Sequence, residues 1–137
     1  MLKSLPALAL FLFLAACDGQ AAEDLGRDPA LLVGTWAWER SETSGFVDPS
    51  VETPATTNRT ETIVFRADET FAEFGVDHRA DPPEFGRGGT YDVRDSSVYV
   101  STGGAERWLG TYEVGRRRLV LSTAAADGDT KTYLRAD

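Results

Sequence analysis

Polar and apolar residues alternate along most of the chain after residue 30, which is the pattern of β-strands that bury one face. A unit of 14 residues occurs twice, at 89–102 and at 110–123, and six of its positions are identical in the two copies. Each copy has the pattern strand, turn, strand. A strand pair that repeats along the chain predicts an antiparallel meander, from which up-and-down barrels are built.

The alternation predicts eight strands and no sustained helix. Three strands are expected at 33–41, 60–66 and 70–76, four belong to the repeat units, and the last is expected at 130–135. Gly, Pro and polar residues predict short turns between strands. These turns are expected at 67–69, 95–96, 103–104, 115–116 and 127–128.

Two segments interrupt the alternation with proline, glycine and many polar residues, and they predict long loops at 42–57 and 77–88. Asp28 followed by Pro29 predicts one helical turn before the first strand, with Asp28 as its N-cap. Phe71 and Phe74 have opposite parity in one strand. This indicates either a bulge near residues 72–73 or one phenylalanine that faces outward.

The fold class predicted for residues 30–137 is all-β, an antiparallel up-and-down meander that closes into a barrel of about eight strands. A chain of this length has enough core to fold without disulfides or metal. One face of each strand is expected to point inward. The expected inward residues are Trp36, Trp38, Ile63, Phe65, Tyr91, Val93, Val98, Val100, Trp108, Tyr112, Val114, Leu119 and Leu121.

The first 17 residues have a short positive start and then an apolar stretch of about 12 residues, too short to span a membrane, which needs roughly 20. This is typical of the hydrophobic part of a secretory signal. The stretch ends in Leu14-Ala15-Ala16-Cys17, which resembles the bacterial lipobox. The resemblance implies that the peptide is cut before Cys17 and that this residue carries acyl chains such as palmitate.

Cys17 is the only cysteine of the chain, so it has no intrachain disulfide partner. Two or three acyl chains give stable membrane anchoring, where one chain alone is marginal. The alternative is an ordinary signal peptide cut near Ala15-Ala16. Residues 18–29 are small, polar and acidic, and we expect them to form a flexible tether. Asp18 resembles the residue that retains lipoproteins of enteric bacteria in the inner membrane.

The chain is acidic, with 22 Asp and Glu against 14 Lys and Arg, a net charge of −8. Such a surface repels phosphate backbones and carries no basic stripe, so nucleic-acid binding is disfavoured. It also repels anionic headgroups, so membrane attachment is expected to depend on the lipid at Cys17. The expected location is the periplasmic face of the bacterial cell envelope.

Several motifs together resemble the bacterial lipocalin-like family. They are Leu32-Val33-Gly34-Thr35-Trp36, the hairpin from Thr62 to Phe71, and the two Gly-Thr-Tyr units at 89–91 and 110–112. The resemblance covers roughly 31–135 and implies a barrel with one open end. It also implies that Trp36 closes the other end beneath an arginine from a late strand, for which Arg135 matches by position. It names no ligand.

Aromatic residues that converge inside a barrel can line an apolar pocket. The candidates for ligand binding are Trp36, Trp38, Arg40, Tyr91, Trp108 and Tyr112. The alternative for the aromatic residues is plain core packing. Arg40 shares a face with Trp36 and Trp38, and an inward arginine needs a carboxylate or another hydrogen-bonding partner. It either binds an anionic ligand or emerges at the barrel mouth.

No catalytic set, metal site or cofactor motif stands out, so we do not expect an enzyme. The only histidine, His78, lies in a polar loop, and a zinc site needs three or four ligands. Asp77, Asp81 and Glu84 match no EF-hand spacing and read as a charged loop. Arg116-Arg117-Arg118 is a basic run at a predicted turn, where it is either solvated or meets an anionic headgroup or partner.

Two functions follow as expectations. The first is a lipid-anchored envelope protein whose lipocalin-like barrel binds a small hydrophobic or amphipathic molecule. The alternative is a filled barrel that serves as a structural or protein-interaction module of the envelope, acting through the loops 42–57 and 77–88.

Overall fold

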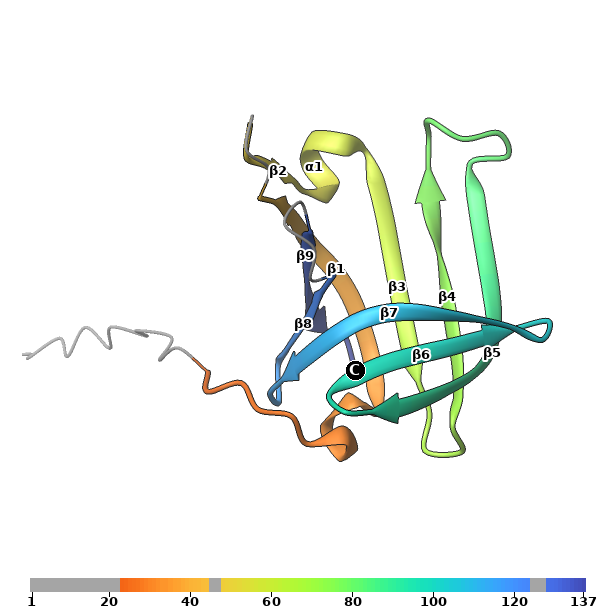
Figure 1. Ribbon diagram of the computed structural model, residues 1–137. Coiled ribbons are helices and arrows are strands. Elements are labelled where there is room, and N and C mark those ends of the chain that lie inside the picture. The colour runs from red at the N-terminus through yellow and green to blue at the C-terminus, as the bar shows by residue number, and fades with distance from the viewer. Residues whose placement is uncertain (1–22, 45–47, 124–127) are drawn as a thin grey trace, which may run out of the picture.

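The computed structural model is an antiparallel β-barrel and describes residues 23–44, 48–123 and 128–137. A 3-10 turn, η1, precedes the first strand, and a short helix, α1, follows the second (Figure 1). The elements are η1 (Pro29–Leu32), β1 (Gly34–Thr43), β2 (Ser50–Glu52), α1 (Pro54–Thr57), β3 (Arg59–Phe65), β4 (Thr70–Asp77), β5 (Glu84–Arg94), β6 (Ser97–Thr102), β7 (Ala105–Val114), β8 (Arg118–Ser122) and β9 (Asp129–Arg135).

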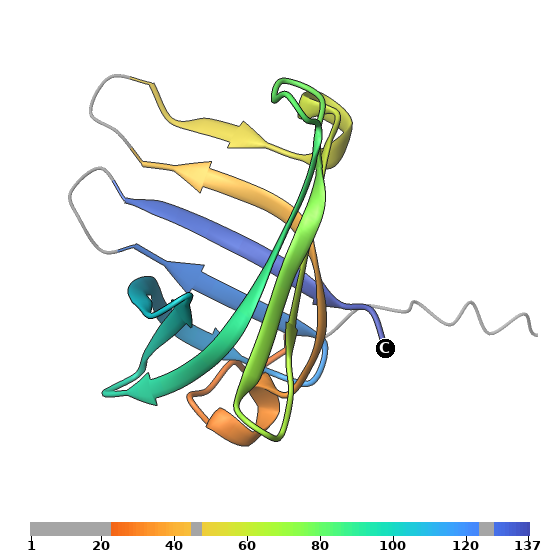
Figure 2. The ribbon, with the colours of Figure 1, turned by 90° about the vertical axis from the view of Figure 1, so that its right-hand side faces the viewer.

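Consecutive strands pair from β3 to β9, and β1 pairs with both β3 and β9, which closes eight strands into a barrel. The predicted all-β meander is therefore confirmed. The ninth strand, β2, pairs only with the far end of β1 and lies outside the closed ring. Figure 2 shows the strands of the ring side by side, with η1 at one end of the barrel.

The two predicted long loops are shorter than expected. The described part of 42–57 contains the end of β1, all of β2 and α1, and the side chains of Thr53 and Thr56 cap α1 reciprocally. In the segment 77–88, β5 already begins at Glu84 and pairs with β4. The predicted loop is too long here because the first residues of β5 are mostly polar or glycine and exposed, although they belong to a strand.

Two β-bulges reverse the side-chain parity that the alternation predicts. In β1 one extra residue, Glu39, lies between the pairs Trp38–Tyr133 and Arg40–Thr132, so Arg40 faces outward and forms an ion pair with Glu42. The expectation that Arg40 points inward is wrong for this reason. Ser41 takes the inward position and accepts a hydrogen bond from Trp38 Nε1 at 3.0 Å.

The second bulge is at Leu109 in β7, between the pairs Val98–Gly110 and Tyr99–Trp108. It moves Trp108 off the inner face and leaves it 40% exposed, so the inward expectation for Trp108 is also wrong. Gly110 is buried at a φ of +139°, and a Cβ there would lie 2.8 Å from the carbonyl oxygen of Ser122. Only glycine accommodates this bend without strain.

The register of β3 and β4 is continuous from Phe65–Phe71 to Arg59–Asp77, without a bulge. Phe71 is therefore buried and Phe74 is exposed on the outer face. Of the two alternatives for this strand, the outward-facing phenylalanine is confirmed.

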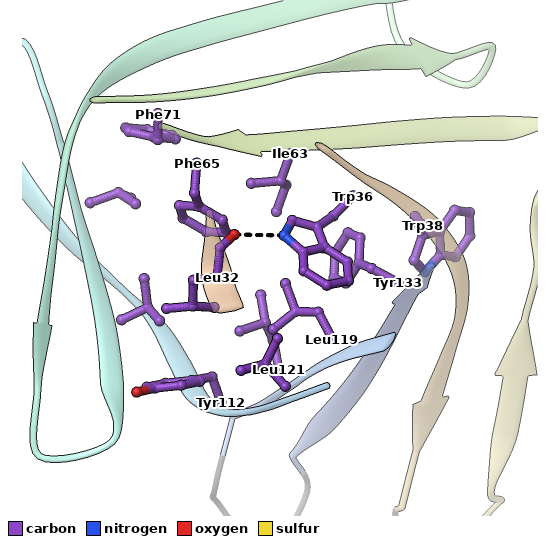
Figure 3. Close-up of a cluster of buried hydrophobic side chains, with 13 residues drawn as sticks. Leu32, Trp36, Trp38, Ile63, Phe65, Phe71, Tyr112, Leu119, Leu121 and Tyr133 are labelled. Atoms are coloured by element: carbon purple, nitrogen blue, oxygen red, sulfur yellow. Dashed lines mark hydrogen bonds between the residues drawn. The ribbon is translucent and has the colours of Figure 1, made fainter. Parts of the chain in front are cut away.

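The buried apolar side chains form one cluster between the strands of the barrel, as Figure 3 shows. Tyr91 and Val93 are only partly buried at its edge, and Tyr91 packs edge-on against Phe65 with ring centroids 4.9 Å apart. Apart from these two and Trp108, every expected inward residue is buried. The buried apolar residues are Leu32, Trp36, Trp38, Ile63, Phe65, Phe71, Val98, Val100, Tyr112, Val114, Leu119, Leu121 and Tyr133.

One end of the barrel, called the closed end below, is sealed by η1 and Trp36. Asp28 caps η1 as predicted, and Trp36 Nε1 donates a hydrogen bond to the Leu32 carbonyl at 2.8 Å (Figure 3). The Arg135 guanidinium lies 4.3 Å from the centroid of the Trp36 ring, which confirms the predicted pairing. It also donates to the carbonyls of Leu31, Val33 and Arg116.

Residues 23–28, at the end of the predicted tether, contact the barrel beside the closed end. Gly26 and Val114 exchange two backbone hydrogen bonds of 3.0 and 2.8 Å. The Glu23 carboxylate accepts from the backbone N–H of Arg117 at 3.0 and 3.2 Å. The predicted signal peptide, Cys17 and Asp18 lie outside the described residues, and no described helix is long and apolar enough to cross a membrane.

Candidate functional site

The half of the barrel opposite the closed end, called the open end below, contains a buried carboxylate, Glu61, that is 2% exposed. Tyr133 donates its hydroxyl to Oε1 at 2.5 Å. Lys131 Nζ lies 3.1 Å from Oε2, and an Arg59 guanidinium nitrogen lies 2.9 Å from the same oxygen. Three donors therefore compensate the burial of this carboxylate, which would be strongly unfavourable without them.

Glu73 is the second buried carboxylate, at 4% exposure. Its Oε2 accepts from Arg87 Nε at 2.6 Å and from an Arg107 guanidinium nitrogen at 2.9 Å. Burial favours the neutral acid, but the hydrogen bond and charge of Arg87, with the charges of Arg107 and Lys131, outweigh it and hold the pKa of Glu73 below its ordinary value.

The strand period explains why these charged residues lie inside. Glu61 has the same parity as Ile63 and Phe65, and Glu73 has the same parity as Phe71. Sequence reasoning missed both acids because it considered only the apolar members of each inward face. The positions were readable from the alternation, whereas the partners Arg107 and Lys131 come from strands far along the chain.

A cavity of about 160 Å³ lies beside the two carboxylates. It forms where β7 and β8 part. β8 pairs only with Thr111–Val114 of β7, so the other half of β7, from Ala105 to Gly110, has no partner on that side among the described residues. The apolar part of the lining is Trp108, Leu109 and Leu121, and the polar part includes Glu61, Glu73, Arg107, Asp129, Lys131 and Tyr133.

The cavity combines donors and acceptors in a nearly charge-balanced setting. Arg107 and Lys131 supply cationic N–H groups beyond those that hold the carboxylates, because each uses only part of its donor capacity. Glu73 also lines the cavity, and its Oε1 accepts no hydrogen bond from any described residue. The arrangement can bind a small molecule that has both an apolar part and a polar group.

Of the six residues predicted to contact a ligand, Trp108 alone lines this cavity. Trp36 seals the closed end, and the Tyr112 hydroxyl donates to the Arg27 carbonyl at 2.7 Å on that same side. Trp38 is buried, with the Arg59 guanidinium 5.7 Å from its ring centroid. The Tyr91 hydroxyl donates to the Arg66 carbonyl, and Arg40 is on the outer face.

The loop residues considered for chemistry do not form a site. His78 and Asp81 are exposed, and Asp77 instead pairs with Arg79 at 3.2 Å. Within the ranges that the structure describes, no group of three His, Cys, Asp or Glu side chains is placed to hold a metal ion.

Because the Tyr133 hydroxyl is buried, we expect the protein to lose stability at alkaline pH. This burial, followed by the nearby charge of Glu61, raises the pKa of the hydroxyl well above the ordinary value of 10.0. Because the pKa is higher in the folded state, the neutral Tyr133 hydroxyl contributes fully to the free energy of unfolding below pH 10. This contribution is lost as the pH rises above 10 toward the folded-state pKa. Urea unfolding from pH 7 to 11 should show a smaller alkaline loss for Tyr133→Phe than for the wild type. Tyr99→Phe, on the outer face, is the control, and an equal loss in all three proteins would contradict the prediction.

The comparisons with known proteins do not assign this barrel to a family. The sequence matches no protein-family model, and no curated protein matches it.

Proposed function

We propose that the protein is a lipid-anchored lipoprotein of the bacterial cell envelope, held through Cys17, whose lipocalin-like barrel binds a small amphipathic molecule. The observation that carries the proposal is the cavity at the parting of β7 and β8, which is lined by Leu109, Leu121 and the edge residue Trp108 together with the charged groups of Arg107 and Lys131. The apolar lining residues suit an apolar group, and the charged and hydroxyl groups suit a polar one.

The size of the cavity limits the ligand. The closed half of the barrel is filled by side chains, which leaves no room for a long acyl chain there. A cavity near 150 Å³ holds a molecule about as large as benzene. The cavity of about 160 Å³ therefore fits a ligand, or the inserted part of one, of that order of size.

Native mass spectrometry of the mature protein, extracted from bacterial membranes in mild detergent, tests both parts of the proposal. We expect a mass increase on Cys17 that persists after denaturation, and a second, smaller one that is lost on denaturation. Replacing Arg107 or Trp108 by alanine should remove the second increase, whereas Phe74→Ala on the outer face should not. A bare polypeptide mass in every preparation would contradict the proposal.

A filled barrel that works through protein contacts is the second candidate. It is favoured by β2 and α1, which order the described part of the loop 42–57 and leave Val51 57% exposed. If this candidate is correct, Val51→Asp should abolish the recovery of one reproducible partner after crosslinking in membranes, and Arg107→Ala should leave it unchanged. Recovery of the same partner with both variants would count against this surface.

A further inference from the structure

The N-terminal segment fixes the point at which the chain leaves the barrel. Gly26 is bridged to Val114, and the Glu23 carboxylate lies on the turn between β7 and β8. Gly115 in that turn is buried beneath Glu23, and a Cβ there would lie 2.5 Å from the Glu23 carboxyl carbon. These contacts place Glu23 beside the closed end of the barrel.

The distance from this exit point to Cys17 is short. Six Cα steps separate Cys17 from Glu23 in the sequence. A fully extended chain spans at most roughly 3.6 Å per step, so Glu23 lies within about 22 Å of Cys17 whatever conformation residues 18–22 adopt. A lipid on Cys17 therefore keeps this side of the barrel close to the bilayer surface.

The turn beside the exit point presents a run of arginines. Arg116, Arg117 and Arg118 are exposed, and their turn is held in place because Arg135 donates to the carbonyls of Arg116 and Arg117. Arg27 is exposed in the segment that leads away from Glu23.

Among the described residues, the side chains of Arg116, Arg117 and Arg118 form no ion pair with an acid, so their guanidinium groups are available to phosphate groups. Glu23 already accepts from the Arg117 backbone, and Asp137 pairs with Arg135. Asp24 and Glu113 are exposed near the turn and form no ion pair among the described residues. Basic side chains near an anionic membrane surface are attracted to it, each adding to the binding.

We propose that the β7–β8 turn docks on anionic phospholipid headgroups, with the closed end toward the membrane and the cavity at the open end directed away from it. The proposal rests on the lipid anchor of the proposed function. It assigns a partner to the one basic run of an acidic chain, and it leaves the parting of β7 and β8 accessible from the periplasm.

Two single-cysteine positions on one strand test the orientation. Glu113 and Ala105 are both exposed and lie at opposite ends of β7. At about 3.3 Å per residue their separation approaches 25 Å, which is enough for distance-dependent quenching. Glu113→Cys and Ala105→Cys are made separately in the mature lipidated protein, where the acylated Cys17 does not react with maleimide. Each is labelled with a fluorophore and reconstituted in vesicles of phosphatidylglycerol and phosphatidylethanolamine that contain a headgroup quencher.

We expect the label at residue 113 to be quenched several-fold more strongly than the label at residue 105. Arg116→Glu with Arg117→Glu should reduce this difference, and so should vesicles of phosphatidylcholine alone. Arg79→Glu, in the exposed loop after β4, is the matched charge reversal and should leave it unchanged.

Equal quenching at both positions, or stronger quenching at residue 105, would overturn the orientation. If the acyl mass on Cys17 were present in that preparation, the proposed lipid anchor would still stand. A difference unaffected by lipid charge and by the arginine reversal would overturn the headgroup contact. Absence of the acyl mass would overturn the anchor and this inference together.

Discussion

Replacing Trp36 by alanine is expected to lower the free energy of unfolding by about 4 kcal/mol, since large aromatic truncations in a core cost about 3–5 kcal/mol. Trp36 is 0% exposed, and its indole N–H satisfies the Leu32 carbonyl. The Arg135 guanidinium would also lose the ring on which it lies. A typical domain has only about 5–15 kcal/mol of stability, so this variant should be close to unfolding at 37 °C.

Urea unfolding followed by circular dichroism measures this effect. Trp108→Ala is the matched control, because it makes the same chemical change at a side chain that is 40% exposed. We expect it to cost less than about 1 kcal/mol. Similar losses for the two variants would mean that Trp36 does not seal the closed end as described.

Replacing Glu61 by alanine is expected to cost about 3–5 kcal/mol, the range for removing one partner of a buried ion pair. The variant leaves Lys131 and Arg59 without their shared carboxylate and Tyr133 without its acceptor. Because the Glu61 side chain is 1% exposed, water can replace these contacts only in part, from the side of the cavity.

The measurement is again urea unfolding at pH 7, with Glu113→Ala as the control at an exposed position of β7. Glu61→Gln keeps the size of the side chain and removes its charge, and its amide oxygen can still accept a hydrogen bond from Tyr133. It therefore measures the part of the stability loss that is due to the charge. We expect Glu61→Gln to be destabilised less than Glu61→Ala but clearly more than Glu113→Ala. A loss below about 1 kcal/mol for Glu61→Ala would contradict the burial of the network.

The barrel could be predicted from sequence because strand alternation and the repeated unit are local signals. Trp36 and Trp38 follow the period of two and are buried, and Arg135 could be matched to Trp36 by its position in the motif. The failures at Arg40 and Trp108 share one cause. A bulge inserts one residue, and its position depends on how distant strands meet rather than on local composition.

The cavity was harder to predict than the barrel. Glu61 and Glu73 lie on inward faces by parity, but a charged residue in a strand is usually assigned to the solvent side. Arg107 follows its partner Glu73 by 34 residues, and Lys131 follows its partner Glu61 by 70 residues. Pairing over such separations is a property of the closed barrel, so no local pattern could indicate it.

The cavity depends on the one extra residue that the bulge at Leu109 inserts into β7. Without the extra residue, the parity of the outer half of β7 would reverse, so that Trp108 would enter the barrel and Arg107 would leave Glu73. The same thirteen-residue apolar core could then support a barrel with no chamber. Deletion of Leu109 is therefore expected to close the chamber, so that in evolution a single-codon change in this strand is enough to gain or lose an internal cavity.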